Sequence, residues 1–511
     1  MAIKRYIATL DNTITNAYKE DFNTRGTGSN MGQSDILEVF GLYSQQSSGS
    51  SEVARTIIQF PVSNISTDRV AGTIPASGSV SFYLNLYNAK HDRTLPRDFY
   101  LTIAALKNAW QEGNGLDMEN YTDLTYDNIG SNWINRQGST AWTTAGGDFY
   151  TDSSSSFTQR FERGDENLEL DITTLVEQWI NSGGNVLGSK TNYGVIIKMT
   201  PSYEPFTATN TGGAKASYYT KKFFARGTEF FYNRPSIEAR WDSSKRDNRG
   251  NFYFSSSLAP AEDNLNCLYL YNYIRGRLRD IEGNSAKVPV LNLYQSSGSI
   301  PEGTALYFRD SNNEAVNFLS ASRESTGLYK VSFSATASVT NTTYTNLVDV
   351  WTYSGSQVHT GSSFTPLKYD LSDTNPYGNY VISMPNLKKS YKKGQTERFR
   401  LYVRNKNWNP NVYTRVISTP ETLMIQSASY QITRMIDNRS VIPYGTGSDN
   451  YTMLSYDVSG NYFDLDMNLF EAGYSYGIRY SFYEDSLSSY KEQPYIFKFH
   501  VSEDPNLNNG E

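Results

Sequence analysis

The chain has little of several residues that mark common protein classes. Its 511 residues include one cysteine, Cys267, and three histidines, which argues against an internal disulfide framework and a histidine-rich metal centre. Cys267 lies in an apolar stretch and is expected to be a small core residue. No run approaches the roughly 18 apolar residues of a membrane span, so we expect no membrane insertion. The first residues, MAIKRY, lack the apolar core of a secretory signal, which predicts a chain made in the cytoplasm.

Positive charge and catalytic signatures are also scarce. Lysine and arginine total 46 against 52 acidic residues, a net charge of −6, so we expect no nucleic-acid partner. The sequence has no phosphate-binding loop, dinucleotide fingerprint or nucleophile elbow. The three histidines, His91, His359 and His500, fall far apart in the chain. We therefore predict no cofactor, no resident metal, no catalytic residue and no enzymatic activity.

Aromatic and turn-forming residues are abundant instead. Aromatic side chains make up 14% of the chain, with 40 tyrosines and 25 phenylalanines, while hydrophobic residues in total reach only 38%. Aromatic residues fit the half-buried surface of a sheet, and the many Ser, Thr, Asn and Gly residues fit turns. A chain of 511 residues is also long for a single core. The composition predicts an all-β protein with several domains.

Strand-like alternation recurs along the chain. Apolar residues occupy every second position in residues 82–86, 329–333 and 399–403, the period of a sheet with one buried face. Only one segment predicts a helix. Thr174 and Glu177 have the spacing of a capping box, and the apolar residues that follow Thr174 share one helical face.

Changes in composition predict three β-domains and a tail. Residues 1–241 form the first domain, and residues 242–250, which are charged and without period, are expected to be a linker or exposed loop. Residues 250–370 and 371–505 are each expected to form an immunoglobulin-like β-sandwich, although neither has the Cys-Trp-Cys signature of true immunoglobulin domains. Residues 506–511 are a polar C-terminal tail.

An ordered set of short motifs runs through the first domain. They are WQEG at 110–113, a tryptophan at 133, AWTTAGGDF at 141–149, DITTLV at 171–176 followed by Trp179, NYGVIIK at 192–198, and RPSI at 234–237. In this order they resemble the DNRLRE-type β-sandwich, which is related to family 96 carbohydrate-binding modules. Ala145 stands where that pattern has proline, and Gly227 interrupts its S-R-E-like turn. The resemblance covers about residues 8–241. It implies a jelly-roll or β-sandwich fold with a binding or scaffolding role and no catalytic motif.

The tryptophans in these motifs allow two interpretations. Trp110, Trp133 and Trp142 are candidates for a glycan-binding platform, because sugar rings stack on exposed aromatic side chains in many carbohydrate modules. The alternative, which we favour, is that these three and Trp179 fill the core and anchor loops, since tryptophan buries a large area.

Acidic residues offer a few weaker candidates. Asp464 with Asp466, and Asp117 with Glu119, have a spacing that would suit the two carboxylates of a glycosidase. Asp464, Asp466 and Asn468 could also bind Ca²⁺, but they lack the glycine and distal glutamate of an EF-hand loop. We favour solvated loop residues in both cases, so no metal site is predicted.

Three classes of function remain open. Cytoplasmic synthesis combined with a tyrosine-rich, β-dense, cysteine-poor composition suits a tailed-bacteriophage virion protein, which is assembled in the host cytoplasm and released by lysis. Our first interpretation is therefore a non-enzymatic virion structural protein of the neck, baseplate, tail-fibre adaptor or capsid surface. It would act as a homo-oligomer through contacts with other virion proteins. The alternatives are an adhesin that binds a host surface glycan and a polysaccharide-degrading enzyme with an accessory module.

Overall fold

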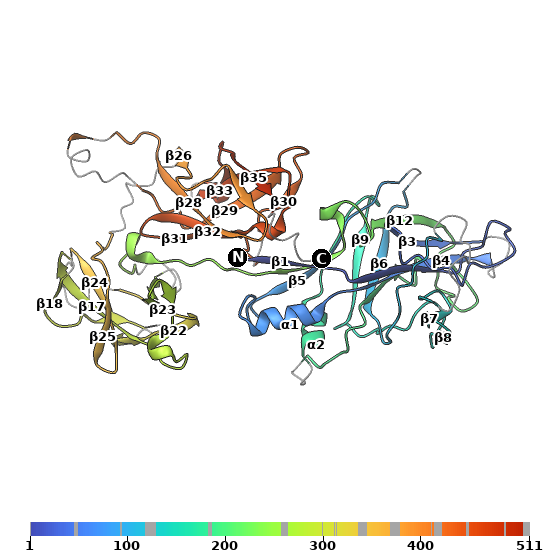
Figure 1. Cartoon of the computed structure of the whole chain (residues 1–511), viewed down its shortest axis with the longest axis horizontal. Helices are drawn as coiled ribbons and strands as arrows, with labels where there is room; N and C mark the ends of the chain where they lie inside the picture. Colours follow the sequence, from blue (N-terminus) through green and yellow to red (C-terminus); the bar gives the residue numbers. More distant parts are fainter. Residues whose placement is uncertain are drawn as a thin grey trace. The chain divides into compact units, whose positions relative to one another are not determined.

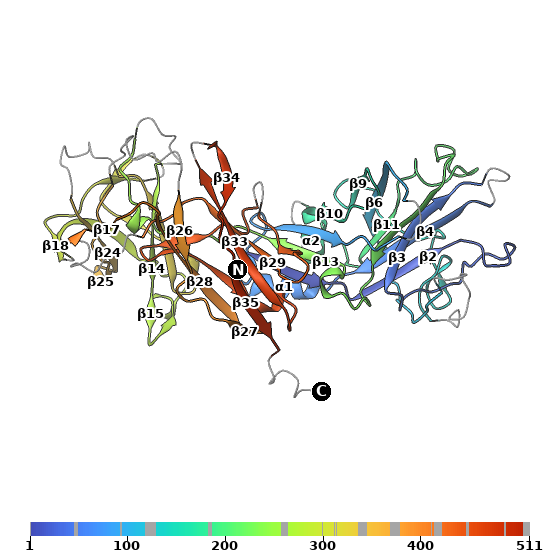
Figure 2. The same cartoon turned by 90° about the horizontal axis from the view of Figure 1, so that it is seen from above.

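The computed structural model describes residues 2–44, 50–91, 95–117, 129–181, 187–256, 264–298, 300–310, 312, 314–335, 345–367, 379–409, 411–412, 422–445, 449–484 and 487–503. The chain divides into two compact units, Ala2–Asp242 and Ser243–Glu511 (Figures 1 and 2). Over the described residues, regular structure is almost entirely strand, and the α-helices are two short ones. The prediction of an all-β protein built of β-sandwiches is confirmed.

Two antiparallel sheets form the unit Ala2–Asp242. The smaller sheet has the strand order β1 (Ile3–Ile7), β13 (Ser236–Arg240), β5 (Ser81–Leu86), β10 (Leu168–Asp171). The larger sheet has the order β12 (Tyr218–Phe224), β3 (Ile36–Leu42), β4 (Glu52–Gln59), β11 (Val195–Met199), β6 (Phe99–Ala105), β9 (Ser156–Phe161), and β2 (Leu10–Thr15) also pairs with β4. A short ribbon of β7 (Asn135–Gln137) and β8 (Thr140–Ala141) lies in the loop between β6 and β9.

Alternating side chains fill the space between the two sheets. Phe82, Leu84 and Leu86 on β5 are all fully buried, as the alternation predicts. In the facing sheet, Ile58 of β4 and Ile197 of β11 belong to the same core cluster. This cluster is the main core of the sandwich.

The other face of the large sheet is also covered. Ile57 and Ile196, the neighbours of the core-facing residues, belong to a second buried cluster that contains Leu106, Trp110 and Trp142. The long loop after β6 therefore packs on this outer face. Burial on both faces explains why β4 and β11 have consecutive apolar residues rather than strict alternation.

Two helices lie side by side in this unit, α1 (Val62–Val70) and α2 (Thr173–Ile180) (Figure 1). The sequence predicted α2 only. Helix α1 has just two buried residues, Val62 and Ile65, and this is too few to give a recognisable helical period.

The capping box predicted for Thr174 and Glu177 is wrong. The residue before α2 is Ile172, whose side chain makes no capping bond, and the N–H of Thr173 donates instead to the Asp171 carboxylate at 2.8 Å. Glu177 instead accepts two hydrogen bonds of 2.6 Å from the Arg69 guanidinium of α1, and only 4% of its side chain is exposed. The Glu177 carboxylate therefore pairs with Arg69 of α1 and does not cap the start of α2.

The unit Ser243–Glu511 contains two further sets of sheets. In the first set, one sheet has the order β14 (Asn266–Tyr271), β23 (Leu328–Phe333), β22 (Ser322–Ser325). The other has the order β18 (Ile300–Glu302), β17 (Val290–Ser297), β24 (Leu347–Tyr353), β25 (Ser356–Thr360), with β21 (Leu319–Ser320) also on β17. Short ribbons join β15 (Tyr273–Ile274) to β16 (Arg277–Leu278) and β19 (Phe308–Arg309) to β20 (Ala315–Val316).

The second set lies further along the chain. Its four-stranded sheet has the order β26 (Tyr380–Ser383), β28 (Thr396–Asn405), β32 (Gly460–Asp466), β31 (Ser455–Asp457). Its six-stranded sheet has the order β27 (Ser390–Lys392), β35 (Phe497–Ser502), β33 (Ser475–Glu484), β29 (Ala428–Arg434), β30 (Ser440–Ile442), and β34 (Ser489–Glu492) also pairs with β33. The predicted inward rows are confirmed, because Tyr329, Val331, Phe333, Phe399, Leu401 and Val403 are all buried.

Residues 242–250, predicted to be a linker or exposed loop, are exposed at Asp242, Arg246 and Gly250 but also contain buried charges. Arg249 forms ion pairs with Asp247 and with Asp349 of β24, and Asp349 is completely buried. Asp247 donates its backbone N–H to Tyr456 of β31, which in turn donates to the carbonyl of Lys245. The segment is charged because it carries a buried ionic network that contacts both sets of sheets.

The predicted boundary between residues 250–370 and 371–505 falls inside the single compact unit Ser243–Glu511. The predicted tail, residues 506–511, lies outside the described residues. Within the described part of the chain, no helix is long and apolar enough to cross a membrane.

Candidate functional site

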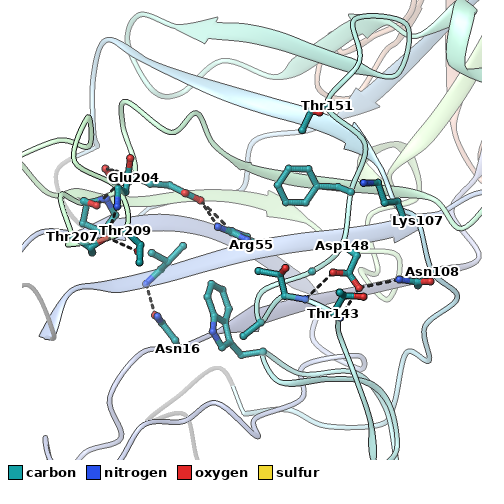
Figure 3. A pocket seen from close by; sticks show the side chains of 18 residues that line it. Asn16, Arg55, Lys107, Asn108, Thr143, Asp148, Thr151, Glu204, Thr207 and Thr209 are labelled. Carbon is teal, nitrogen blue, oxygen red and sulfur yellow. Dashed lines mark hydrogen bonds and ion pairs between the residues drawn. The ribbon is translucent and has the colours of Figure 1, made fainter.

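A pocket of about 610 Å³ lies on the outer face of the large sheet in the unit Ala2–Asp242 (Figure 3). Its floor includes Val53 and Arg55, which alternate with the core-facing residues of β4. Its walls come from Lys107 and Asn108 after β6, from Trp133, from residues 143–151, and from residues 204–210 after β11. Chain segments distant in sequence thus meet over one sheet face.

Asp148 organises the wall that follows β8. Its carboxylate accepts hydrogen bonds of 2.8 Å from the Thr143 N–H, 2.9 Å from the Thr144 N–H and 2.9 Å from the Asn108 side-chain amide (Figure 3). Burial acts to raise the pKa of Asp148, but the hydrogen bonds from Thr143, Thr144 and Asn108 outweigh it and lower this pKa. The aspartate of the AWTTAGGDF motif therefore holds its own loop in place as a carboxylate.

The two glycines of the same motif are required by the shape of this wall. Gly146 has a φ of +88°, and a Cβ there would lie 2.7 Å from the Trp133 ring and 2.9 Å from the Arg55 guanidinium. Gly147 has a φ of +103°. Residues with a side chain rarely adopt such conformations, so glycine allows the loop to approach Trp133 closely.

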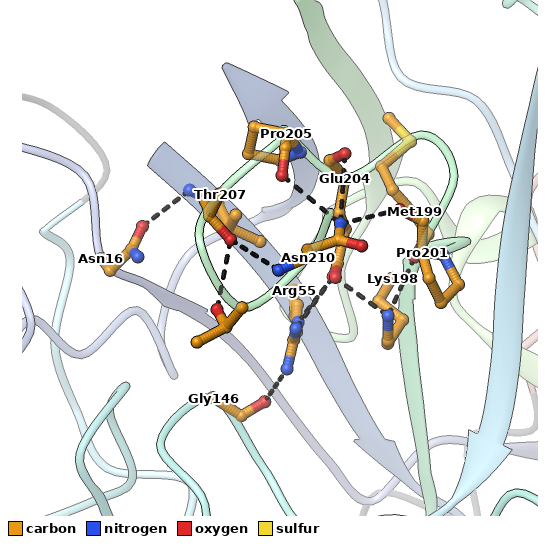
Figure 4. A network of polar contacts seen from close by, with 12 residues as sticks. Asn16, Arg55, Gly146, Lys198, Met199, Pro201, Glu204, Pro205, Thr207 and Asn210 are labelled. Atoms are coloured by element: carbon orange, nitrogen blue, oxygen red, sulfur yellow. Dashed lines mark hydrogen bonds and ion pairs between the residues drawn. The ribbon is translucent and has the colours of Figure 1, made fainter. Parts of the chain in front are cut away.

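A buried ionic network forms the second wall (Figure 4). The Glu204 carboxylate oxygen Oε1 lies 2.9 Å from Arg55 Nη2 and 3.0 Å from Lys198 Nζ. Arg55 also donates to the Gly146 carbonyl at 2.7 Å, and its guanidinium lies 5.1 Å from the Trp133 ring centroid. Arg55 therefore fixes both walls of the pocket at once.

Burial and the neighbouring charges determine the charge state of Glu204 and Lys198. Burial acts to raise the pKa of Glu204, but Arg55 and Lys198 lower it overall. Burial lowers the pKa of Lys198, although Glu204 opposes the shift. Both pocket carboxylates, Asp148 and Glu204, thus have a lowered pKa. A glycosidase needs one carboxyl that stays protonated as a general acid, so this pair is unsuited to that role.

The remaining groups at the pocket suit the binding of a polar molecule. Lys107 is exposed, its Nζ lies 5.3 Å from the Tyr150 ring centroid, and it forms no ion pair with any described residue. Hydroxyls of Thr143, Thr151, Thr207 and Thr209 line the same space. An aromatic ring beside hydroxyls, amides and an exposed ammonium can bind a ligand that has both an apolar face and many hydrogen-bonding groups.

The predicted tryptophans divide between core and pocket. Trp110 and Trp142 are 6% and 4% exposed, and their indole N–H groups donate to the carbonyls of Tyr193 and Asn132 at 2.9 Å. Trp179 of α2 is also buried. Trp133 alone is half-buried and lines the pocket. The three candidates of the proposed platform therefore do not share one exposed surface.

The other candidates do not come together in a site. Asp464 pairs with Arg398 at 2.7 Å, and Asp466 accepts a hydrogen bond from the backbone N–H of Asn468. Asp117 is buried near Asn30, and Glu119 lies outside the described residues. No cluster of three or more potential metal ligands occurs among the residues described.

Cys267 is half-buried rather than fully buried in the core. It lies on β14, and its thiol contacts the Ser332 hydroxyl at 3.1 Å.

Two of the pocket residues, Arg55 and Glu204, were not identified from the sequence. Arg55 and Glu204 are 149 positions apart and meet only through the pairing of distant strands. An arginine inside the apolar run of β4 was the one available sign, because a charge there must face a partner or solvent. Asp148 was visible as part of a motif, but its three hydrogen bonds were not.

Comparison with models of known protein families finds none that matches this chain, and comparison with curated proteins finds no match either. Solved structures show distant similarities. The adhesin InvE of Yersinia pseudotuberculosis is 12% identical, over 46% of this chain and 54% of its own, with a TM-score of 0.15. A chimeric tandem of titin domains is 12% identical, over 42% of this chain and 85% of its own, with a TM-score of 0.15.

A fragment of the ICAM-5 ectodomain is 8% identical, over 36% of this chain and 41% of its own, also with a TM-score of 0.15. This chain therefore spans about half the length of the InvE structure. At such TM-scores these similarities carry no argument about what the protein does.

Proposed function

We propose that this chain is a non-enzymatic structural protein of a tailed-bacteriophage virion, located at the neck, baseplate, tail-fibre adaptor or capsid surface. It acts as a homo-oligomer and contacts other virion proteins through its β-sandwiches. In this proposal the unit Ala2–Asp242 is a DNRLRE-like body, and the unit Ser243–Glu511 supplies the adaptor surfaces.

The observation that carries this proposal is the ribbon of β33 and β34, which extends beyond the rest of its sheet (Figure 2). All four residues of β34 are exposed. Tyr483 and Tyr490 are 39% and 49% exposed, and their rings contact each other at 5.3 Å. Exposed strand edges invite pairing with another chain, and tyrosine is enriched at protein interfaces.

Purified virions test the proposal directly. Mass spectrometry of particles assembled in an infected host is expected to detect this chain in several copies. Replacing Tyr483 and Tyr490 together by serine is expected to reduce its incorporation into particles. Tyr273→Ser, at an exposed tyrosine of another ribbon, is the matched control. Particles that lack the chain altogether would refute a virion role.

A glycan-binding adhesin is the second candidate, and the pocket at Trp133 favours it. The half-buried indole, the threonine hydroxyls and the exposed ammonium of Lys107 are the kinds of group that bind a saccharide. The ligand in this case would be a host surface glycan. The tightly paired Asp148 and Glu204 agree with binding rather than cleavage of such a ligand.

A glycan array followed by calorimetry separates the two candidates. If the pocket binds a glycan, Thr151→Val and Lys107→Ala are expected to weaken binding at least tenfold without affecting folding, because both side chains are exposed. Lys90→Ala, at an exposed lysine outside the pocket lining, is the control. Retention of full affinity in both pocket variants would eliminate this site as the glycan site.

A further inference from the structure

Lys221 of β12 has a completely buried side chain, which is unusual for a lysine. Its Nζ atom lies 5.0 Å from the ring centroid of Phe161 and 4.9 Å from that of Phe223. Both phenylalanines are also fully buried. The amine is therefore held between two aromatic rings and away from water.

Three oxygen atoms surround the same nitrogen. Nζ lies 2.6 Å from the side-chain oxygen Oδ1 of Asn88, 2.8 Å from the Gly164 carbonyl and 2.8 Å from the Glu166 carbonyl. Two of these are main-chain oxygens of one turn, and the third belongs to a side-chain amide. The side-chain amide is the only one of the three whose substitution would release ammonia and leave the main chain intact.

Sheet geometry explains why Lys221 and Asn88 meet. Asn88 forms an antiparallel bridge with Phe223, and Ala89 donates its N–H to the carbonyl of Lys222. Lys221 and Phe223 are two positions apart on β12, so their side chains point to the same face as the side chain of Asn88. The contact is thus a diagonal cross-strand pair set by the register of the sheet.

We propose that Lys221 and Asn88 become joined by an intramolecular isopeptide bond, which makes this pair a site of self-catalysed covalent cross-linking. The neutral ε-amine attacks Asn88 Cγ, the Nζ–Cγ bond forms, and the Cγ–Nδ2 bond breaks. One amine proton moves to Nδ2, which leaves as ammonia. The reaction exchanges one amide for another, so it needs no oxidant, reductant or external acyl donor.

The three acceptor oxygens equal in number the N–H bonds of a protonated lysine. A protonated lysine has three N–H bonds, one for each oxygen. When it loses the proton that faces Asn88, the other two N–H bonds still serve the Gly164 and Glu166 carbonyls. The lone pair then faces the Asn88 side chain, and the amine must shift from Oδ1 toward Cγ to attack. Such fixed positioning is a major source of rate in intramolecular reactions.

Two further features support the reaction. His91 Nε2 lies 3.3 Å from Asn88 Oδ1, where an N–H can stabilise the negative charge that develops on the oxygen during attack. Burial lowers the pKa of Lys221 to about 7, so a neutral, nucleophilic amine is available near neutral pH.

Mass spectrometry of the intact, denatured full-length protein tests the proposal. After purification and incubation near neutral pH, its mass is expected to be lower than the sequence mass by one ammonia. A proteolytic digest is expected to contain a branched peptide that joins Asn88 to Lys221, and cleavage after Lys221 is expected to be absent.

Three variants sharpen the test. Lys221→Arg retains a cation for the two carbonyls but cannot form the bond, so its mass is expected to equal its sequence mass. Asn88→Ala is expected to do the same by removing the acceptor. His91→Ala is expected to slow the loss of ammonia at least tenfold, and an unchanged rate would refute the role assigned to His91.

A wild-type protein at its full sequence mass, cleaved normally after Lys221, would overturn the proposal. In that case Lys221 is a buried ammonium held by three oxygens. An ammonia loss that maps to other residues, or that persists in Lys221→Arg, would overturn it as well.

Discussion

At the scale of single residues, Asp11 shows how burial links stability to pH. Its side chain is 1% exposed, and it accepts a hydrogen bond from the backbone N–H of Arg226. Burial raises the pKa of Asp11 from 3.8 to about 7, and the nearby charge of Glu112 adds to the increase. The folded state therefore holds this proton more tightly than the unfolded chain does.

The raised pKa of Asp11 determines how the stability of the folded state changes with pH. A raised pKa in the folded state gives stability that is complete below about pH 4 and is lost as the pH rises to about 7. Asp11→Asn keeps a neutral acceptor for Arg226, so it is expected to remove this pH dependence. We expect the variant to be more stable than the wild type at pH 8, by about 2–4 kcal/mol, since one pKa unit corresponds to about 1.4 kcal/mol.

Chemical denaturation across this pH range measures the effect. Asp35→Asn, at an exposed aspartate, is the control and is expected to follow the wild-type profile. The interpretation fails if Asp11→Asn has the same pH profile as the wild type.

The tryptophans give a second prediction at this scale. Trp142 is buried and bonded to the Asn132 carbonyl, so Trp142→Ala is expected to cost about 3–5 kcal/mol of unfolding free energy. Trp133→Ala is expected to cost less, because Trp133 is half-buried at the pocket. Thermal and denaturant unfolding of the two variants measures the difference. Equal losses would contradict the assignment of Trp133 to the pocket wall.

At the scale of elements, the network around Arg249 connects residues 247–249 to β24 in the unit Ser243–Glu511. Asp349 accepts hydrogen bonds from the Arg249 guanidinium and, at 2.6 Å, from the indole N–H of Trp351. Asp349→Ala would leave both donors buried without this acceptor, and we expect a loss of about 3–5 kcal/mol. Asp464→Ala breaks the more exposed pair with Arg398 and is expected to cost about 1 kcal/mol or less.

Denaturant unfolding of the two aspartate variants decides between these expectations. A similar small loss in both would show that the buried network contributes no more than a surface pair. A large loss in Asp349→Ala alone would support its role in holding residues 245–249 against the sheets.

Some strands and helices could be predicted from the sequence, and others could not. The inward rows of β5, β23 and β28 could be predicted, because a side-chain period of two is a local property. Helix α1, the ion pair of Glu177 and the buried charges of residues 245–249 could not, because each depends on a partner far away in the chain. Composition identified residues 242–250 as polar, but polarity alone does not distinguish a solvated loop from a buried network of paired charges.

In the candidate site too, local motifs could be predicted but contacts between distant residues could not. The AWTTAGGDF motif marked the loop that forms one wall of the pocket, and Trp133 was among the residues singled out. The opposite wall, formed by Glu204 with Lys198 and Arg55, required the pairing of β4 with β11. Motifs therefore located half of the pocket, and long-range pairing supplied the other half.

At the scale of the whole molecule, the two ends of the unit Ala2–Asp242 lie in the same sheet. Its first strand, β1, pairs with its last strand, β13, so that Ile3 lies opposite Arg240. β13 also pairs with β5, which places it inside the sheet rather than at an edge. The main core of the sandwich is formed by residues of this unit alone. A chain that ends after Asp242 therefore retains every strand that its sheets require.

We expect a fragment of residues 1–242 to fold alone, with the cooperative unfolding and dispersed amide spectrum of a native domain. A fragment of residues 1–234 lacks β13, leaves β1 and β5 without a common neighbour, and is expected to remain unfolded. The full-length protein is expected to unfold in two calorimetric transitions, the first-unit transition coinciding with that of the 1–242 fragment. A single transition, or an unfolded 1–242 fragment, would mean that the first unit depends on the second for stability. A first unit that folds alone is what the virion proposal requires, because that proposal gives the body and the adaptor surfaces to separate units.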